Sequence, residues 1–199
     1  MERSREARPP INVEGELVAL GPLRRDLIPT YQRWHNDVAT TRTFALPQPT
    51  TLEQEEASYA ELSTAKDMAF FTIYERVARR PVGTAYLTDI DHRHRRAEFG
   101  VLIGEPTCRG KGYGTEATRL MLDYAFTALG LHNVMLTCYE FNLAGQRAYA
   151  NAGFREFGRR RQSHWMGGRW WDEVYMECLA TGFVSPVLDR IFAPDAARP

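Results

Sequence analysis

The chain has 199 residues, of which 44% are hydrophobic, and this size and composition suit one domain with a single core. Its 25 basic and 25 acidic residues cancel, so no net charge draws the protein to nucleic acid or to a membrane surface. The sequence contains no apolar run of membrane-spanning length and no signal-peptide core, and we expect a cytoplasmic protein without nucleic-acid or membrane partners.

The cysteines and histidines do not form a metal-binding pattern. Cys108, Cys138 and Cys178 cannot all pair with one another and show no metal-ligand spacing with the histidines. His92 and His94 alternate along an expected turn, where solvation explains them better than a metal does. We therefore expect free thiols in a reducing compartment and no metal site.

Alternating strand-like and helix-like periodicity predicts an α/β domain (α+β in some schemes) over residues 11–182. Residues 1–10 are charged and aperiodic, so we expect a disordered leader, and we expect the C-terminal extension 183–199 to be partly disordered. The expected strands are 17–20, 68–74, 82–90, 97–103, 134–139, 154–163 and 170–178. The expected helices are 23–34, 52–62, 112–129 and 142–152, with Thr50 and Glu53 as a capping box for the second.

The stretch 99–117 combines a buried strand, a loop and the start of a helix. Within Arg109–Gly114, glycines remove side chains next to the first free N–H groups of the helix, while an arginine and a lysine add positive charge. Such a loop suits a pyrophosphate at the positive end of the helix dipole. From these residues alone, a tight solvated turn explains the glycines equally well.

Two other phosphate-binding motifs fit this stretch less well. Gly112-x-Gly114-x-x-Ala117 is similar to a dinucleotide fingerprint, but that motif follows its strand directly, whereas residues 104–109 intervene here. A Walker loop would end in Gly-Lys-Ser or Gly-Lys-Thr, and neither is present.

Arg109–Gly114 resembles the Arg/Gln-x-x-Gly-x-Gly/Ala signature of the GNAT superfamily of acyl-CoA N-acyltransferases. Ala97–Gly100 is similar to the family's fourth strand, Asn142–Tyr149 to its N-x-x-A-x-x-x-Y segment and Tyr149–Phe154 to its Y-x-x-x-G-F signature. The chain is most similar to the branch of ribosomal-protein N-terminal acetyltransferases and spermidine acetyltransferases. Gly145 departs from the family, which usually has Ala there, and we expect it to loosen the helix.

The resemblance implies a mixed, mostly antiparallel twisted sheet of about seven strands, with a splayed parallel pair at its centre and helices on its faces. It also implies acetyl-CoA as the cosubstrate. The implied cofactor contacts are Val101, Leu102, Ile103, Arg109, Gly110, Lys111, Gly112, Tyr113, Gly114, Thr115 and Asn142. The expected acceptor contacts are Trp34, His35, Phe44 and Tyr139. Ordinary core packing is the alternative for Trp34 and Phe44.

The expected reaction is transfer of an acetyl group to a primary amine by direct attack in a ternary complex. Tyr149 matches the family's general-acid tyrosine, and we expect it to protonate the leaving thiolate. The backbone N–H of Leu102 is the expected oxyanion donor. Glu98 lies in an apolar strand, where burial would raise its pKa and suit it to accept the amine proton, and His35 and Tyr139 are further candidates. The alternative for Glu98 is a carboxylate held by an arginine for structure.

The acceptor stays open between a small molecule and a protein N-terminus. A rival interpretation is a non-catalytic module that binds acyl-CoA and regulates a partner, although such a module would need the loop but not Tyr149. Trp165, Trp170 and Trp171 lie in the terminal hairpin, and because adjacent strand residues point to opposite faces, Trp170 and Trp171 cannot both be buried in one core face. The hairpin is therefore expected to meet another copy of the chain or to line the acceptor cleft, and we expect a homodimer.

Overall fold

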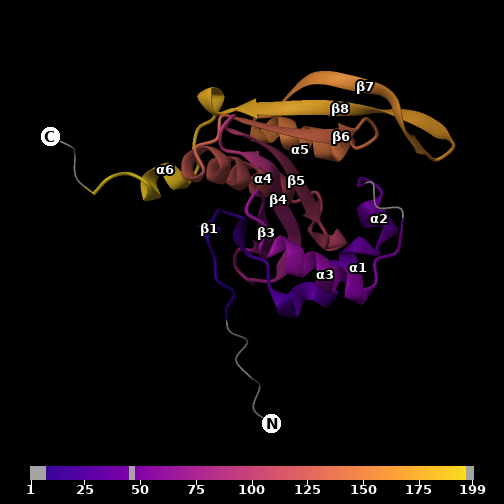
Figure 1. The fold of residues 1–199 in the computed structure, drawn as a ribbon, viewed down its shortest axis with the longest axis horizontal. Helices are drawn as coiled ribbons and strands as arrows, with labels where there is room; N and C mark the ends of the chain where they lie inside the picture. Colours follow the sequence, from indigo (N-terminus) through magenta and orange to yellow (C-terminus); the bar gives the residue numbers. More distant parts are fainter. Residues whose placement is uncertain (1–7, 45–47, 196–199) are drawn as a thin grey trace, which may run out of the picture.

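The computed structural model describes residues 8–44 and 48–195, and its centre is an eight-stranded sheet in the order β1-β2-β3-β4-β5-β6-β8-β7 (Figure 1). The strands are β1 (Val13–Glu14), β2 (Val18–Pro22), β3 (Ala69–Glu75), β4 (Pro81–Asp91), β5 (Arg96–Ile103), β6 (Asn133–Tyr139), β7 (Arg155–Met166) and β8 (Arg169–Leu179). The helices are α1 (Ile28–His35), α2 (Val38–Thr41), α3 (Leu52–Leu62), α4 (Tyr113–Asp123), α5 (Leu143–Ala152) and α6 (Leu188–Ile191). Short 3-10 turns are found at Arg25–Leu27, Pro106–Cys108 and Ala180–Gly182, and a π-helical turn at Tyr124–Ala128.

The divergence of β5 and β6 is the feature of the sheet that matters most for the site. These strands run parallel and pair only where Arg96–Glu98 lies beside Asn133–Met135. Beyond that point β5 continues along β4 and β6 continues along β8, so the two strands separate. The predicted splayed parallel pair in a mostly antiparallel sheet is confirmed.

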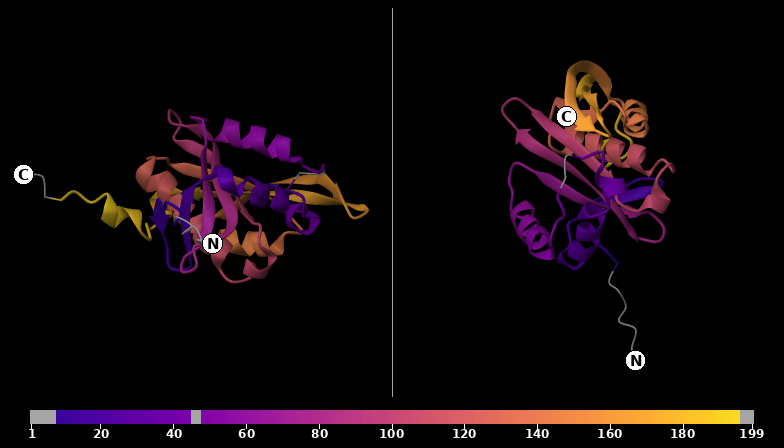
Figure 2. Two further views of the ribbon diagram at one scale, coloured as in Figure 1. Left: turned by 90° about the horizontal axis from the view of Figure 1, so that it is seen from below. Right: turned by 90° about the vertical axis from the view of Figure 1, so that its right-hand side faces the viewer.

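Helices cover both faces of the sheet. Figure 2 shows α3 on one face and α4 and α5 on the opposite face. Ala117, Leu120 and Met121 recur at helical spacing and are buried, so α4 packs one apolar stripe onto the sheet. The strands contribute buried residues such as Leu87 and Phe99 to the same core. This packing fixes the first turn of α4 beside the open end of β5.

Two carboxylates of α4 hold segments from the N-terminal and C-terminal parts of the described chain. The Asp123 carboxylate is 0% exposed and accepts hydrogen bonds from the Thr127 hydroxyl at 2.8 Å and from the Val187 and Leu188 amides at 3.0 and 2.9 Å. Earlier in α4, the Glu116 carboxylate accepts hydrogen bonds from the three backbone N–H groups of residues 16–18. The described part of the C-terminal extension is therefore attached to the domain.

The structure differs from the sequence-based expectations in local details. The sheet has eight strands rather than about seven, because the two-residue β1 pairs with β2. The capping box of α3 uses Thr51 and Gln54, one residue later than predicted, and both of its reciprocal hydrogen bonds are present. Residues 1–7 and 196–199, for which disorder is expected, lie outside the described residues, as do residues 45–47. Among the described helices, none is long and apolar enough to cross a membrane.

Candidate active site

The N-terminus of α4 lacks a side-chain cap. Gly112 is the N-cap residue with φ of 83°, and Gly110 has φ of 71°, both in the left-handed region that favours glycine. The Glu116 amide is the first to bond within the helix, donating to the Gly112 carbonyl. The amides of residues 113–115 therefore lie at the positive end of the helix with no capping side chain among the described residues, as an anionic ligand requires.

The side chains around this loop are not equivalent. The Arg109 Nε donates to the Ile103 carbonyl at 3.2 Å, and its guanidinium bonds to the Thr40 hydroxyl, so Arg109 ties the loop to β5 and α2 while lining the groove. The Tyr113 hydroxyl donates to Glu75 at 2.9 Å, which turns its side chain away from the groove. Lys111 is exposed. Of the three side chains, only that of Arg109 borders the groove, and Tyr113 can contribute its amide.

A groove of about 560 Å³ leads from this loop along the open edge of β5 to α5. Of the predicted cofactor contacts, it is lined by Val101, Leu102, Ile103, Arg109, Gly110, Gly112, Gly114, Thr115 and Asn142. Tyr149 lines the same groove. The structure thus brings together the predicted phosphate loop, the free strand edge and the predicted catalytic tyrosine.

Asn142 begins α5, and its position explains the unusual glycine beside it. The Asn142 side-chain oxygen accepts a hydrogen bond from the Gly145 amide at 3.0 Å, which caps the helix. A Cβ atom added at Gly145 would lie 2.5 Å from the Asn142 amide nitrogen. Glycine therefore allows the capping side chain to pack closely against the first turn of α5.

Tyr149 lies where the groove meets a second cavity. Its ring contacts Phe99 and Phe154 edge-on, with centroids 6.4 and 6.2 Å apart. The second cavity, here called the strand chamber, has a volume of about 350 Å³ and opens between the diverging ends of β5 and β6. Burial raises the pKa of Tyr149, with smaller contributions from Cys138 and Tyr86, so its phenol stays protonated at neutral pH.

Glu98 and Tyr139 also line the strand chamber. The Glu98 side chain is exposed, so the burial expected for it is wrong: Glu98 lies on the face of β5 opposite the buried Ala97 and Phe99. Tyr139 is stacked on His164 with ring centroids 3.9 Å apart. Both residues therefore lie near Tyr149, Glu98 as a solvated carboxylate and Tyr139 as part of an aromatic wall.

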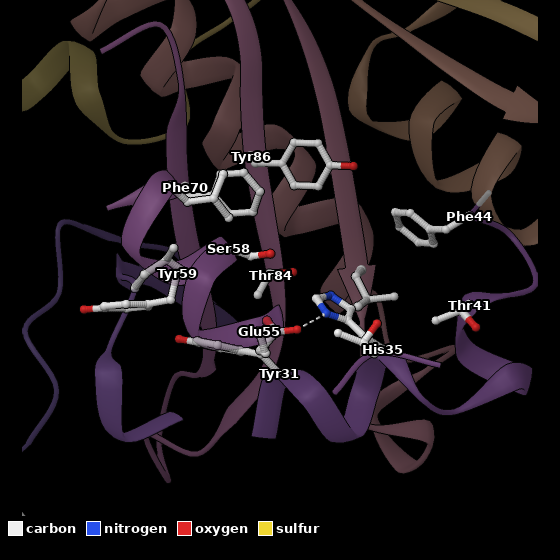
Figure 3. A pocket seen from close by; sticks show the side chains of 14 residues that line it. Tyr31, His35, Thr41, Phe44, Glu55, Ser58, Tyr59, Phe70, Thr84 and Tyr86 are labelled. Carbon is white, nitrogen blue, oxygen red and sulfur yellow. Dashed lines mark hydrogen bonds and ion pairs between the residues drawn. The ribbon is translucent and has the colours of Figure 1, made fainter. Parts of the chain in front are cut away.

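A third cavity, here called the acceptor cavity, has a volume of about 280 Å³ and lies between α1, α3 and the sheet (Figure 3). Its wall includes His35 and Phe44, two of the expected acceptor contacts. Leu102 lines both this cavity and the groove, and Phe44 borders all three spaces. The three spaces therefore converge beside β5.

Trp34 is not part of the wall of this cavity. It is 1% exposed, packs on Tyr31 and Leu102, and donates from its indole nitrogen to Glu105 at 2.9 Å. A Cβ atom at Gly104 would lie 2.2 Å from the Trp34 ring, so the indole lies flat against the backbone. Of the two interpretations of Trp34, the structure supports core packing.

The chain matches the Acetyltransferase (GNAT) domain family over residues 18–155. It belongs to the GNAT acetyltransferase family. The loop at the start of α4 and the diverging strands lie within the matched range. As a GNAT acetyltransferase, the protein transfers an acetyl group from acetyl-CoA to an amine.

Relatives of this GNAT protein include several N-acetyltransferases. It is 29% identical to the spermidine N(1)-acetyltransferase of Escherichia coli (strain K12) over 167 residues, 80% of this chain and 84% of the relative. It is 35% identical to alpha/beta-tubulin-N-acetyltransferase 9 of Homo sapiens over 130 residues, 59% of this chain and 62% of that protein. The solved spermidine N-acetyltransferase from Vibrio cholerae, in complex with CoA and spermine, shares the fold with a TM-score of 0.78 at 24% identity, over 85% of this chain and 99% of that one.

Two residues of the acceptor cavity were missed from the sequence. Glu55 is 6% exposed and lies on the cavity wall, paired with His35. Its place at helical spacing between Leu52 and Tyr59 is a signal that could have revealed it. Tyr86 gave no such signal, because its position depends on another strand: a Cβ atom at Gly100 would lie 2.1 Å from the Tyr86 ring.

Proposed function

We propose that this acetyltransferase passes the acetyl group directly from acetyl-CoA to a primary amine, without an acetyl-enzyme intermediate. The observation that carries the proposal is the convergence of the groove, the strand chamber and the acceptor cavity on β5. Cys138 is the thiol in the strand chamber, but burial raises its pKa to about 12, so it stays a protonated, weak nucleophile. Proximity of two bound substrates then supplies much of the rate.

In the proposed mechanism the amine nitrogen attacks the thioester carbon, and the C–N bond forms as the C–S bond breaks. The backbone N–H of Leu102 is proposed to stabilise the oxyanion, because Leu102 borders both the groove and the acceptor cavity. Tyr149 gives its hydroxyl proton to the departing thiolate and regains a proton that the amine loses. Two candidates can take the amine proton: Glu98, through water, since its carboxylate is exposed in the strand chamber, and His35 on the wall of the acceptor cavity.

Acetyl-CoA fits the residues that are present. The uncapped amides of residues 113–115 and the Arg109 guanidinium suit the pyrophosphate. The unpaired edge of β5 at Val101–Ile103 suits the amides of the pantetheine arm.

The test of direct transfer uses acetyl-CoA with and without an amine. Without an amine we expect no stoichiometric burst of CoA and no added acetyl mass on the protein. With an accepted amine we expect CoA release and an acetylated product in equal amounts. An acetylated Cys138 or Cys108 would refute direct transfer, and acetyl-CoA binding without turnover on any amine would support the regulatory-module interpretation.

We also propose a homodimer formed through the β7–β8 hairpin, and the cytoplasm as the site of action. Trp165 and Trp170 are 57% and 54% exposed and meet edge-on, with ring centroids 5.1 Å apart. Trp171 is partly buried and bonds to the Met166 carbonyl at 3.1 Å, so the other two indoles form the free surface. Light scattering that gave only a monomer at every concentration would refute the dimer.

The cytoplasm is proposed because the three free, buried cysteines suit a reducing compartment.

A further inference from the structure

The acceptor cavity combines a largely apolar wall with one buried carboxylate. Phe70 and Tyr86 stack with ring centroids 4.6 Å apart and form part of the wall, together with Phe44. Among the described lining residues, Glu55 carries the one carboxylate. A buried carboxylate in such surroundings is costly unless a donor or a cation compensates it.

His35 supplies that donor, and the contact defines its tautomer. The His35 Nδ1 lies 2.8 Å from the Glu55 Oε2. Because an ionised carboxylate only accepts hydrogen bonds, Nδ1 carries the proton, and Nε2 of a neutral imidazole keeps a lone pair. Figure 3 shows the imidazole ring of His35 between the Glu55 carboxylate and the part of the cavity that Phe44 and Tyr86 border. The side chain of His35 is 28% exposed and that of Glu55 is 8% exposed, so the imidazole alone reaches solvent.

Hydrogen bonds between the C-terminal end of α1 and Thr50, just before α3, hold His35 and Glu55 in place. The Asn36 side chain donates to the Thr50 carbonyl at 2.8 Å and accepts from the Thr50 amide at 3.0 Å. The Gln32 side chain donates to the same carbonyl at 3.0 Å. His35 and Glu55 are thus fixed by neighbouring residues on both elements and do not depend on each other alone for their positions.

We propose that the acceptor cavity binds the amine substrate, and that His35 is the catalytic base with Glu55 as its positioning residue. The inference rests on the proposed direct transfer to a primary amine. An ammonium group loses one proton to the His35 Nε2, and the Glu55 carboxylate stabilises the resulting imidazolium. The neutral amine then attacks the thioester carbon. Its second proton restores the Tyr149 hydroxyl, and His35 releases the first proton to solvent.

The same lining defines the class of acceptor. A single carboxylate in a wall that is otherwise aromatic, aliphatic and hydroxyl-bearing suits one ammonium group on a compact apolar body. A second ammonium would meet neutral hydroxyl groups, such as those of Ser58 and Thr84, and no second carboxylate to balance its charge. We therefore assign a small monoamine with an apolar or aromatic body, such as 2-phenylethylamine, in place of a polyamine or a peptide.

The test compares 2-phenylethylamine, spermidine and a short peptide with a free N-terminus as acceptors for the full-length protein. We expect kcat/KM for 2-phenylethylamine to exceed the other two at least tenfold. For that amine, His35→Gln should lower kcat/KM about 10²-fold and Glu55→Gln at least about tenfold. Glu56→Gln is the matched control, because Glu56 is the exposed neighbour on α3 and should behave as the wild type.

Three further measurements separate chemistry from folding. Acetyl-CoA affinity, measured by calorimetry, should be unchanged in all variants. Imidazole in the buffer should partly restore the activity of His35→Ala, and Glu55→Asp should retain more activity than Glu55→Gln, as a base and its positioning carboxylate require.

Preference for spermidine or the peptide would overturn the acceptor class. Activity of both His35→Gln and Glu55→Gln equal to Glu56→Gln, or a larger loss in Glu98→Gln than in His35→Gln, would overturn the assigned base. If the wild type acetylates no amine at all, the proposed function fails along with the inference.

Discussion

Replacing Tyr149 with Phe isolates proton donation from packing. The ring contacts with Phe99 and Phe154 do not involve the hydroxyl group. The raised pKa of Tyr149 comes from burial and from nearby Cys138 and Tyr86, with no hydrogen bond to the described residues contributing. The substitution therefore removes the dissociable proton and breaks no bond within the described part of the fold.

These features set the expected magnitudes. A positioned general acid contributes about 10²–10⁴-fold to the rate, which corresponds to roughly 2.7–5.4 kcal/mol of activation free energy. The free energy of unfolding should stay within about 0.5 kcal/mol of the wild type, because no packing is lost. Since burial raises the pKa of Tyr149 above its ordinary value of about 10, wild-type kcat should show no alkaline loss from this group below about pH 10.

The assay is single-turnover acetyl transfer with saturating acetyl-CoA and an accepted amine, so that slow product release cannot hide the chemical step. Tyr124→Phe is the control, because Tyr124 is a partly buried tyrosine next to α4 whose ring packs on Phe71. We expect a large loss in Tyr149→Phe and none in the control. A Tyr149→Phe rate within about threefold of the wild type would make Tyr149 a packing residue and assign thiolate protonation to water.

Other predictions concern the cofactor loop, the sheet and the pH dependence of stability. Gly112→Asp places a negative charge where we propose that the pyrophosphate binds and should weaken CoA affinity by roughly 1–4 kcal/mol in calorimetry, whereas exposed Gly182→Asp should not; equal affinities would show that the loop is misassigned. Gly100→Ala puts a methyl group within 2.1 Å of the Tyr86 ring and should lower the free energy of unfolding by about 1–3 kcal/mol in urea titration, so a neutral result would contradict this close approach. Burial raises the pKa of Tyr31 to about 12, so the unfolded chain loses this proton before the folded one, and the free energy of unfolding should fall by about 2 kcal/mol between pH 10 and 12. Tyr31→Phe should flatten that fall, and an equally steep fall in the variant would assign it to other groups.

The glycine loop before α4 could be recognised in the sequence because its determinants are local. The left-handed residues Gly110 and Gly112 and the helix that follows them are neighbours in the chain. Their spacing indicates the loop, whereas its assignment to a phosphate came from the resemblance to the GNAT family, as did the roles of Asn142 and Tyr149, which belong to a single helical segment. The parallel pairing of β5 and β6, which the resemblance implied, agrees with a crossover connection through α4.

The acceptor side was decided by tertiary structure. The burial of Trp34, the exposure of Glu98 and the pairing of His35 with Glu55 depend on which elements pack together. The space for the Tyr86 ring likewise depends on a glycine from a neighbouring strand. Local periodicity tells which residues share a face of a strand or helix, but not what lies opposite that face. Burial and charge pairing arise from long-range packing, and for that reason the chain's local pattern determined the glycine loop before α4, whereas the folded structure determined the cavity between α1, α3 and the sheet.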